Sequence, residues 1–327
     1  MYYSIVQTNK FRYSSPIRES VMEVRMQPFN TAGQRCLSFG LSIRPQTRVH
    51  SYEDYVGNIV HHFDVPARHT ALHITAEAMV EIIPGDDLPD ALPSTAWRDA
   101  LYYAEDGNAY EMLLPSHFAH PTKLLLELAD ELDVCRRDDP LTLLRQISEQ
   151  IHQRFQYMRA STRADSPIDE ALEARQGVCQ DFTHIFIALA RHAGLACRYV
   201  SGYLYSPNKR DRIMTGATHA WAEALLPGLG WIGFDPTNNS LAGTRHIRVA
   251  IGRDYADVPP TRGVFKKSAA TISELQVNVR ITPSRPPESP LELLGQQEGL
   301  SALGDLAHQP EQQQQFRSRN PIPDPSP

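Results

Sequence analysis

The sequence has no long hydrophobic run and no excess of basic residues. Its 327 residues include 32 Lys and Arg against 38 Asp and Glu, which gives a formal charge of −6. Charges of both signs are spread along the chain, so we expect neither nucleic acid nor an anionic membrane as a partner. No stretch approaches the length of a membrane span, and the first residues lack an apolar segment of signal-peptide length. These absences predict a cytoplasmic protein.

Cysteine is scarce, and its spacing excludes two common roles. The four cysteines, Cys36, Cys135, Cys179 and Cys197, lie far apart and form no CxxC pair. In a chain of this size, such spacing predicts neither a disulfide framework nor a zinc site. The histidines of segment 61–73 have no recognised ligand spacing either. We therefore predict no metal and no cofactor, and reduced cysteines of which most fill the core.

Composition and periodicity divide the chain into four parts. Short segments with alternating apolar and polar residues predict an antiparallel β domain over residues 1–85. A connector rich in Pro and Asp follows over residues 86–115. Residues 116–282 show helical periodicity, then strands, and end in a strand-like segment, which predicts an α+β domain of helices packed on an antiparallel sheet. The Pro- and Gln-rich residues 283–327 predict a disordered tail.

Cys179 stands at a position that would activate a thiol. The stretch RQGVCQDFTHIFIALARHAG (175–194) places it two residues after a glycine, at the predicted start of a helix. The first turn of a helix offers unpaired backbone N–H groups and the positive end of the dipole, which favour a thiolate. A buried structural cysteine is the alternative, because free cysteine is among the most buried residue types. His184, further along this helix, is expected to be a solvated or capping side chain.

A reactive thiolate needs a base, and the segment ATHAWAEALLPGLGWIGFDPTNN (217–239) predicts one on a β-hairpin. A three-residue loop would pair Leu225 with Leu229. His219 would then lie directly opposite Asp235, and a register slip would leave the two diagonal but within side-chain reach. A carboxylate in this place fixes the tautomer and orientation of a histidine and stabilises its cation. An ordinary polar cross-strand pair is the alternative.

The segments around Cys179, His219 and Asp235 resemble, in order and spacing, the core of the bacterial transglutaminase-like superfamily. That core is a papain-like fold with a Cys–His–Asp triad. The segments YEDYVGN and GRDYADVPPTRGVF are similar to the N-terminal β domain and the post-core segment of one bacterial branch, so the likeness covers about residues 1–282. The resemblance implies Cys179 as the nucleophile, His219 as the general base and Asp235 as the orienting carboxylate.

The mechanism that the resemblance implies is acyl transfer from an amide of a peptide or protein. A thioester forms on the cysteine, and hydrolysis is favoured over transfer to an amine. The backbone N–H of Cys179 is one expected oxyanion donor, and Gln180 or Tyr157 is the second. Trp221 either packs the hairpin or shapes a substrate subsite. A catalytically silent interaction module is the alternative function.

Overall fold

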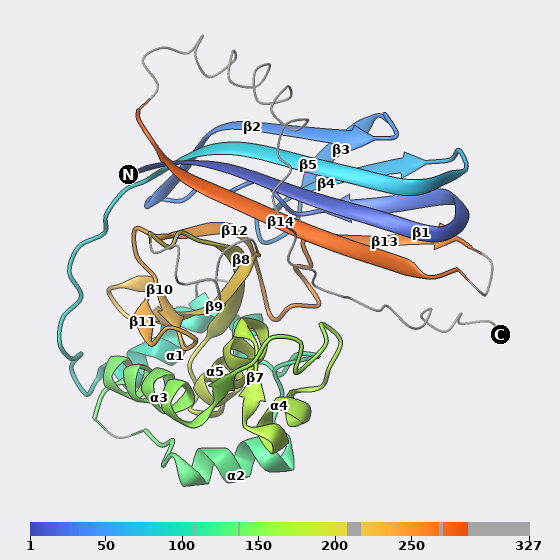
Figure 1. Ribbon diagram of the computed structural model, residues 1–327. Coiled ribbons are helices and arrows are strands. Elements are labelled where there is room, and N and C mark those ends of the chain that lie inside the picture. Colours follow the sequence, from blue (N-terminus) through green and yellow to red (C-terminus); the bar gives the residue numbers. More distant parts are fainter. Residues whose placement is uncertain (107–108, 137, 208–216, 268–270, 287–327) are drawn as a thin grey trace.

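The computed structural model describes residues 1–106, 109–136, 138–207, 217–267 and 271–286. An N-terminal antiparallel β half-barrel lies against a second unit, in which helices pack on an antiparallel sheet (Figure 1). The predicted α+β class is therefore confirmed. The predicted tail lies, from residue 287 on, outside the described residues. Among the described residues, no helix has both the length and the apolar character that a membrane crossing requires.

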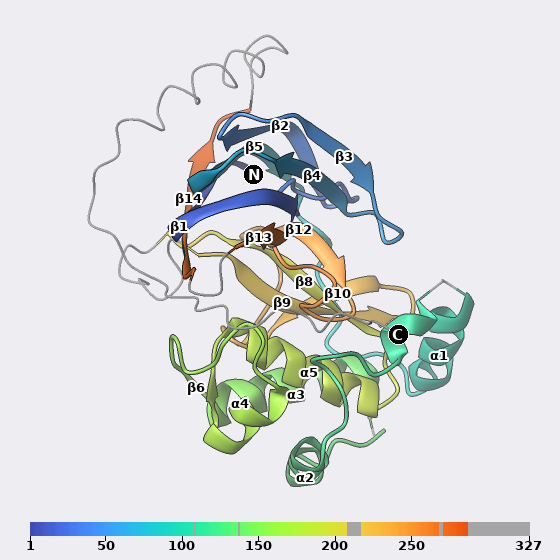
Figure 2. The same ribbon diagram turned by 90° about the vertical axis from the view of Figure 1, so that its right-hand side faces the viewer.

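The long strand β1 (Tyr2–Val24) is the centre of the half-barrel. Side chains of its first half are alternately buried and partly exposed, as expected for a sheet with one covered face. Figure 2 shows how strongly this sheet curves. Six further strands complete it: β2 (Gln34–Arg44), β3 (Val49–Glu53), β4 (Ile59–Val65), β5 (His69–Ile82), β13 (Thr261–Lys266) and β14 (Ser273–Ser284).

The last strand of the described chain joins the first. β14 pairs antiparallel with β1 from Tyr2↔Ser284 to Tyr13↔Ser273. From the sequence, this segment is expected at the end of the unit of residues 116–282. The sheet partner is instead a strand more than 250 residues away, which local periodicity cannot indicate.

The second unit is built around the helix α5 (Cys179–His192). Its five-stranded antiparallel sheet has the order β11-β10-β9-β8-β12. The strands are β8 (Cys197–Leu204), β9 (His219–Leu226), β10 (Gly230–Asp235), β11 (Ser240–Leu241) and β12 (His246–Gly252). The other helices are α1 (Ala96–Asp106), η1 (Tyr110–Leu113), α2 (Lys123–Glu131), α3 (Pro140–Arg154) and α4 (Ile168–Ala174). Two short strands, β6 (Gln156–Tyr157) and β7 (Gln176–Gly177), pair in parallel.

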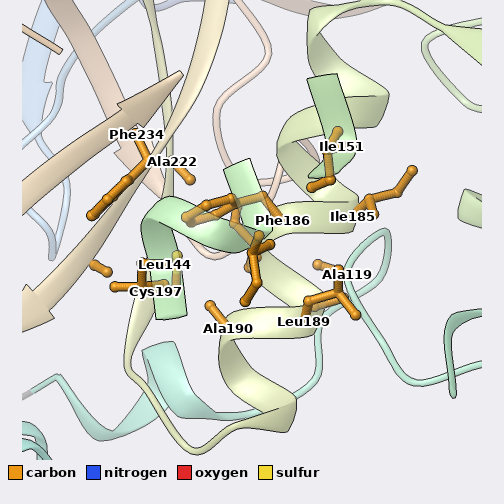
Figure 3. Close-up of a cluster of buried hydrophobic side chains, with 14 of the residues drawn as sticks. Ala119, Leu144, Ile151, Ile185, Phe186, Leu189, Ala190, Cys197, Ala222 and Phe234 are labelled. Atoms are coloured by element: carbon orange, nitrogen blue, oxygen red, sulfur yellow. The ribbon is translucent and has the colours of Figure 1, made fainter. Parts of the chain in front are cut away.

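One hydrophobic cluster fixes α5 between the sheet and the other helices. Figure 3 shows its side chains from α3, α5 and the strands. The apolar face of α3 is buried here, and the Phe186 ring of α5 stacks on Phe234 of β10 at 5.4 Å. Each large apolar side chain buried in this way stabilises the fold by about 1.5–3 kcal/mol. The start of α5 is therefore held rigidly against the sheet.

The half-barrel covers the free edge of the second sheet with two side-chain amides. Gln34 donates from Nε2 to the carbonyl oxygen of Arg248 and accepts the Arg248 N–H at Oε1, both at 2.8 Å. Asn58, the last residue of YEDYVGN, does the same for Ile251, at 2.8 and 2.7 Å. Open edge strands expose N–H and C=O groups that can pair with another chain. Here the two amides take the place of a neighbouring strand on β12.

Candidate active site

Cys179 is the first residue of α5 and is half-buried. The preceding residue, Val178, has extended backbone, and its N–H donates to the Asp181 carboxylate at 2.8 Å. Thr162 also donates to Asp181, at 2.5 Å. Burial raises the pKa of Asp181, and these hydrogen bonds oppose that rise. Asp181 therefore fixes the first turn of the helix, and with it the position of the thiol.

The hairpin forms as predicted, but its register differs. Trp231 pairs with Leu225, and Gly230 pairs with Leu226, so the predicted pairing of Leu225 with Leu229 is wrong. The glycines at 228 and 230 both adopt positive φ, of 73° and 74°, which places the turn one residue later than expected. The slip leaves His219 and Asp235 diagonal, and their side chains still meet.

His219 and Asp235 form a buried hydrogen-bonded pair. Nε2 of His219 lies 2.7 Å from Oδ2 of Asp235, and the two residues are 4% and 0% exposed. Asp235 also accepts the backbone N–H groups of Thr237 and Asn238 at Oδ1, and the Asn238 side chain donates to Oδ2 at 2.6 Å. Burial raises the pKa of Asp235, but the charge and hydrogen bonds of the neighbouring histidines bring it well below its usual range. The carboxylate is therefore ionised.

The other ring nitrogen of His219, Nδ1, makes no hydrogen bond within the described residues. It is buried, and the Cys179 side chain lies close enough to interact with the ring. Burial lowers the pKa of His219, but the Asp235 charge, the hydrogen bond to it and the interaction with Cys179 raise it to about 10. A ring that bonds a carboxylate at Nε2 keeps Nδ1 for a proton exchanged with its other neighbour. The structure thus brings the three predicted triad residues together.

A second histidine, which sequence reasoning missed, bonds the same carboxylate. His246, the first residue of β12, lies with Nε2 3.1 Å from Oδ2 of Asp235 and is 3% exposed. From the sequence alone, its segment RHIRVAIG (245–252) predicts only a strand. Because β8 separates β12 from the hairpin, only the sheet order brings His246 to this site. A histidine at the start of a predicted strand was the one available signal.

Two of the remaining predicted site residues lie beside Cys179 with different partners. Tyr157, in β6, pairs with Gly177. Burial first, then the charge of Cys179, raises the pKa of the Tyr157 phenol to about 12, so the hydroxyl keeps its proton near the sulfur. Gln180 instead donates from Nε2 to the carbonyl oxygen of Ala164 at 3.0 Å. Of the two side chains, Tyr157 is the one whose hydroxyl interacts with Cys179.

Trp221, the third, is fully buried at 0% exposure. Its ring stacks near His219 at 6.1 Å and meets His246 edge-on at 5.1 Å. It thus packs the hairpin behind the histidines and presents no exposed edge to a substrate, which leaves the first of the two predicted roles.

His184 corrects another expectation. It was predicted as a solvated or capping side chain, yet it is 2% exposed and its ring stacks on Phe118 at 5.2 Å. Its Nε2 accepts the backbone N–H of Tyr255 at 3.2 Å. Burial lowers the pKa of His184 to about 3, so the ring is neutral. The apolar surroundings of α5 on this side account for the error, because the helix is covered on more faces than its periodicity indicates.

His219, Asp235 and His246 also have the spacing of metal ligands. One ligand atom each from His219, Asp235 and His246 lies within 4.8 Å of the others, and the described residues hold no further group of this kind. However, Nε2 of each histidine already forms a hydrogen bond with Oδ2 of Asp235. The hydrogen bonds account for the spacing without an ion.

Comparisons with known proteins place both units of the chain in one family. A family model described as the transglutaminase-like superfamily matches residues 128–236, and one described as the bacterial transglutaminase-like N-terminal region matches residues 3–81. An uncharacterized protein of Mycobacterium tuberculosis (strain H37Rv) is 35% identical over 296 residues, which is 86% of this chain and 92% of that protein. This chain belongs to the transglutaminase-like superfamily. The predicted resemblance is thereby confirmed.

Further similarity extends this membership along the chain. An uncharacterized protein of Mycobacterium leprae is 30% identical over 282 residues, covering 85% of this chain and 97% of that protein. A crystal structure of a protein from Cytophaga hutchinsonii, described as a candidate cysteine protease, superposes with a TM-score of 0.66 at 20% identity. It covers 88% of this chain and 94% of its own, so this transglutaminase-like fold is shared over both units.

Proposed function

We propose that this protein is a cysteine-dependent acyl-transfer enzyme that acts on amide bonds of peptides or proteins. One observation carries the proposal: a buried His219–Asp235 pair lies next to a half-buried cysteine at the start of a helix. An imidazolium and a helix N-terminus both favour the thiolate form of a neighbouring cysteine. Membership of the transglutaminase-like superfamily supports the same chemistry.

The proposed reaction has two halves. The Cys179 sulfur attacks the amide carbonyl carbon, and His219 delivers the proton from Nδ1 to the leaving nitrogen as the C–N bond breaks. The product is a thioester. Water then attacks the thioester carbon, gives a proton back to His219, and releases the acid as the C–S bond breaks. Asp235 keeps the ring oriented throughout and stabilises its cationic form.

Negative charge on the substrate oxygen needs donors near the sulfur. The backbone N–H of Cys179 is one of the first-turn groups that have no partner within the helix. The Tyr157 hydroxyl is the second proposed donor, since it stays protonated and lies close to Cys179. Arg159 forms a hydrogen bond with this hydroxyl, which leaves the phenol proton available for the substrate.

Hydrolysis is the proposed outcome because water is the most abundant acceptor. To test this, the wild type and Cys179→Ala are incubated with a peptide library, with and without a primary amine, and the product masses are measured. Cys135→Ala is the matched control, since Cys135 is exposed and outside the site. We expect cleaved peptides from the wild type and the control. Mass gains that require the amine would indicate transfer, and turnover by Cys179→Ala would refute the proposed nucleophile.

The same incubation, together with iodoacetamide labelling of the wild type, addresses the alternative function. A folded wild type that neither cleaves nor joins any peptide, and whose Cys179 reacts no faster with iodoacetamide than Cys135, would favour the silent interaction module.

A further inference from the structure

We propose that His246 is a positioning residue of this site, which holds the Asp235 carboxylate in the orientation that His219 needs. The inference deepens the proposed acyl-transfer function and rests on it. It concerns a residue of β12, outside the hairpin that carries His219 and Asp235.

The hydrogen bonds of His246 fix its tautomer. Its Nδ1 accepts the backbone N–H of Gly243 at 3.2 Å, so the ring proton is on Nε2. Nε2 therefore donates to Oδ2 of Asp235, the same oxygen that bonds His219. Burial lowers the pKa of His246, and the charge of His219 lowers it further, while Asp235 raises it. The net shift is downward, so the ring is a neutral donor. Asp235 thus stands between a charged and a neutral histidine.

The packing of the Trp221 indole against β8 depends on a missing side chain at Gly202. In β8 the backbone of Gly202 lies between His219 of β9 and Arg248 of β12. A Cβ on Gly202 would meet the Trp221 ring at 2.6 Å and would collide with the carbonyl oxygen of Ile247. The glycine therefore leaves room for the indole, which packs against the rings of His219 and His246.

The strand that carries His246 is itself held on both edges. β8 pairs with one edge, and the Gln34 and Asn58 amides of the half-barrel bond the other at Arg248 and Ile251. A donor on such a strand has little freedom to move away from Asp235. This is the arrangement expected of a group that orients a catalytic carboxylate.

The groups that face the two rings are few. Asp235 of β10 and Cys179 of α5 face His219, and Asp235, His219 and Arg245 face His246. Without the neutral donor, Oδ2 of Asp235 would keep only the Asn238 amide and His219 as side-chain partners. The pKa of His219 would then rise further, and the ring would give up its proton to the leaving nitrogen less readily.

The first test compares His246→Leu, which removes the donor and keeps an apolar volume, with His246→Gln, which retains an N–H donor near the Nε2 position. We expect kcat to fall about tenfold to a hundredfold in the leucine variant with KM within about twofold of wild type. The glutamine variant should stay within about threefold of wild type. His69→Leu is the matched control: His69 is buried and bonds Ser20 at 3.1 Å in the half-barrel, so only stability should fall.

The second test does not depend on turnover. The titration of His219 is followed by ¹⁵N NMR of the histidine rings, and the iodoacetamide reaction of Cys179 by mass spectrometry, in the same variants. We expect a higher pKa of His219 and a changed alkylation rate in His246→Leu but not in His246→Gln. In the Asp235→Asn background, His246→Leu should add no further change.

The outcomes separate this inference from the proposed function. Equal effects of the leucine and glutamine variants would assign His246 a purely structural role. The same conclusion would follow if His246→Leu lowered kcat as much in the Asp235→Asn background as in wild type. A protein without amide turnover that still shows the selective His219 shift would refute the proposed activity and keep the positioning role.

Discussion

The two sides of the candidate site differ in how firmly they are held. On the sheet side, His219, Asp235 and His246 are at most 4% exposed and linked through one carboxylate oxygen. On the helix side, Cys179 and Tyr157 are partly exposed. The difference indicates a base that is oriented before substrate arrives and a nucleophile that remains accessible. Such preorganisation removes the reorganisation cost from the reaction step.

Removal of the nucleophile should have the largest effect. We expect Cys179→Ala to lower kcat/KM by at least about 10⁴-fold, because no other group can form the thioester. The free energy of unfolding should change little, since the side chain is only half-buried. Kinetics with a cleaved peptide and urea denaturation measure the two. Substantial remaining activity would place the nucleophile elsewhere.

Replacement of the Asp235 carboxylate on the sheet side should have the second largest effect on the rate. Asp235→Asn keeps the shape but offers His219 an uncharged partner, and the rate should fall about 10⁴-fold, as when the carboxylate of a catalytic triad is replaced by an amide. Circular dichroism should show an intact fold. An unchanged rate would reduce Asp235 to a structural role.

The pH dependence of stability should show the same ion pair. The pKa of His219 is raised to about 10 in the folded state, so the pair stabilises fully below the unfolded value of about 6.5 and loses this contribution as pH rises toward 10. The lowered pKa of Asp235 keeps it charged down to acid pH. Urea denaturation at pH 6 and pH 9.5 should therefore show a larger loss for wild type than for Asp235→Asn. Parallel losses would exclude the ion pair.

The helix side should give the smallest change. We expect Tyr157→Phe to lower kcat about 10²-fold, the usual cost of one oxyanion donor, with little effect on KM. Gln180→Ala is the matched control and should keep kcat within about threefold, because its amide is bonded to Ala164. The reverse order of the two variants would assign the oxyanion site to Gln180.

Local sequence patterns predict those parts of the site that lie within one helix or one hairpin. The start of α5 follows from its apolar face and the residues before Cys179, and the hairpin follows from period-two alternation around turn residues. The predicted register was wrong, yet the two side chains of His219 and Asp235 still meet. A turn that closes one residue later moves each cross-strand partner by two residues, which keeps both side chains on the same face of the sheet.

Other parts depend on contacts between distant segments. The turn closed one residue later than predicted, at Gly230, since two positive-φ glycines were available and periodicity does not rank them. His246 reaches the site only through the strand order β9-β8-β12, and β14 finds its partner at the other end of the chain. The complete burial of Trp221 and His184 likewise follows from packing by several elements. None of these can be read from a single segment.

The most direct test of activation compares Cys179 with Cys135 in the wild type. Cys135 is exposed and Cys179 is half-buried, so access alone would make Cys135 the faster thiol. With limiting iodoacetamide at pH 7 and mass-spectrometric mapping of all four cysteines, we predict that Cys179 is alkylated first, and that this lead disappears in His219→Ala. Alkylation of Cys135 before Cys179, in a folded wild type, would contradict the account.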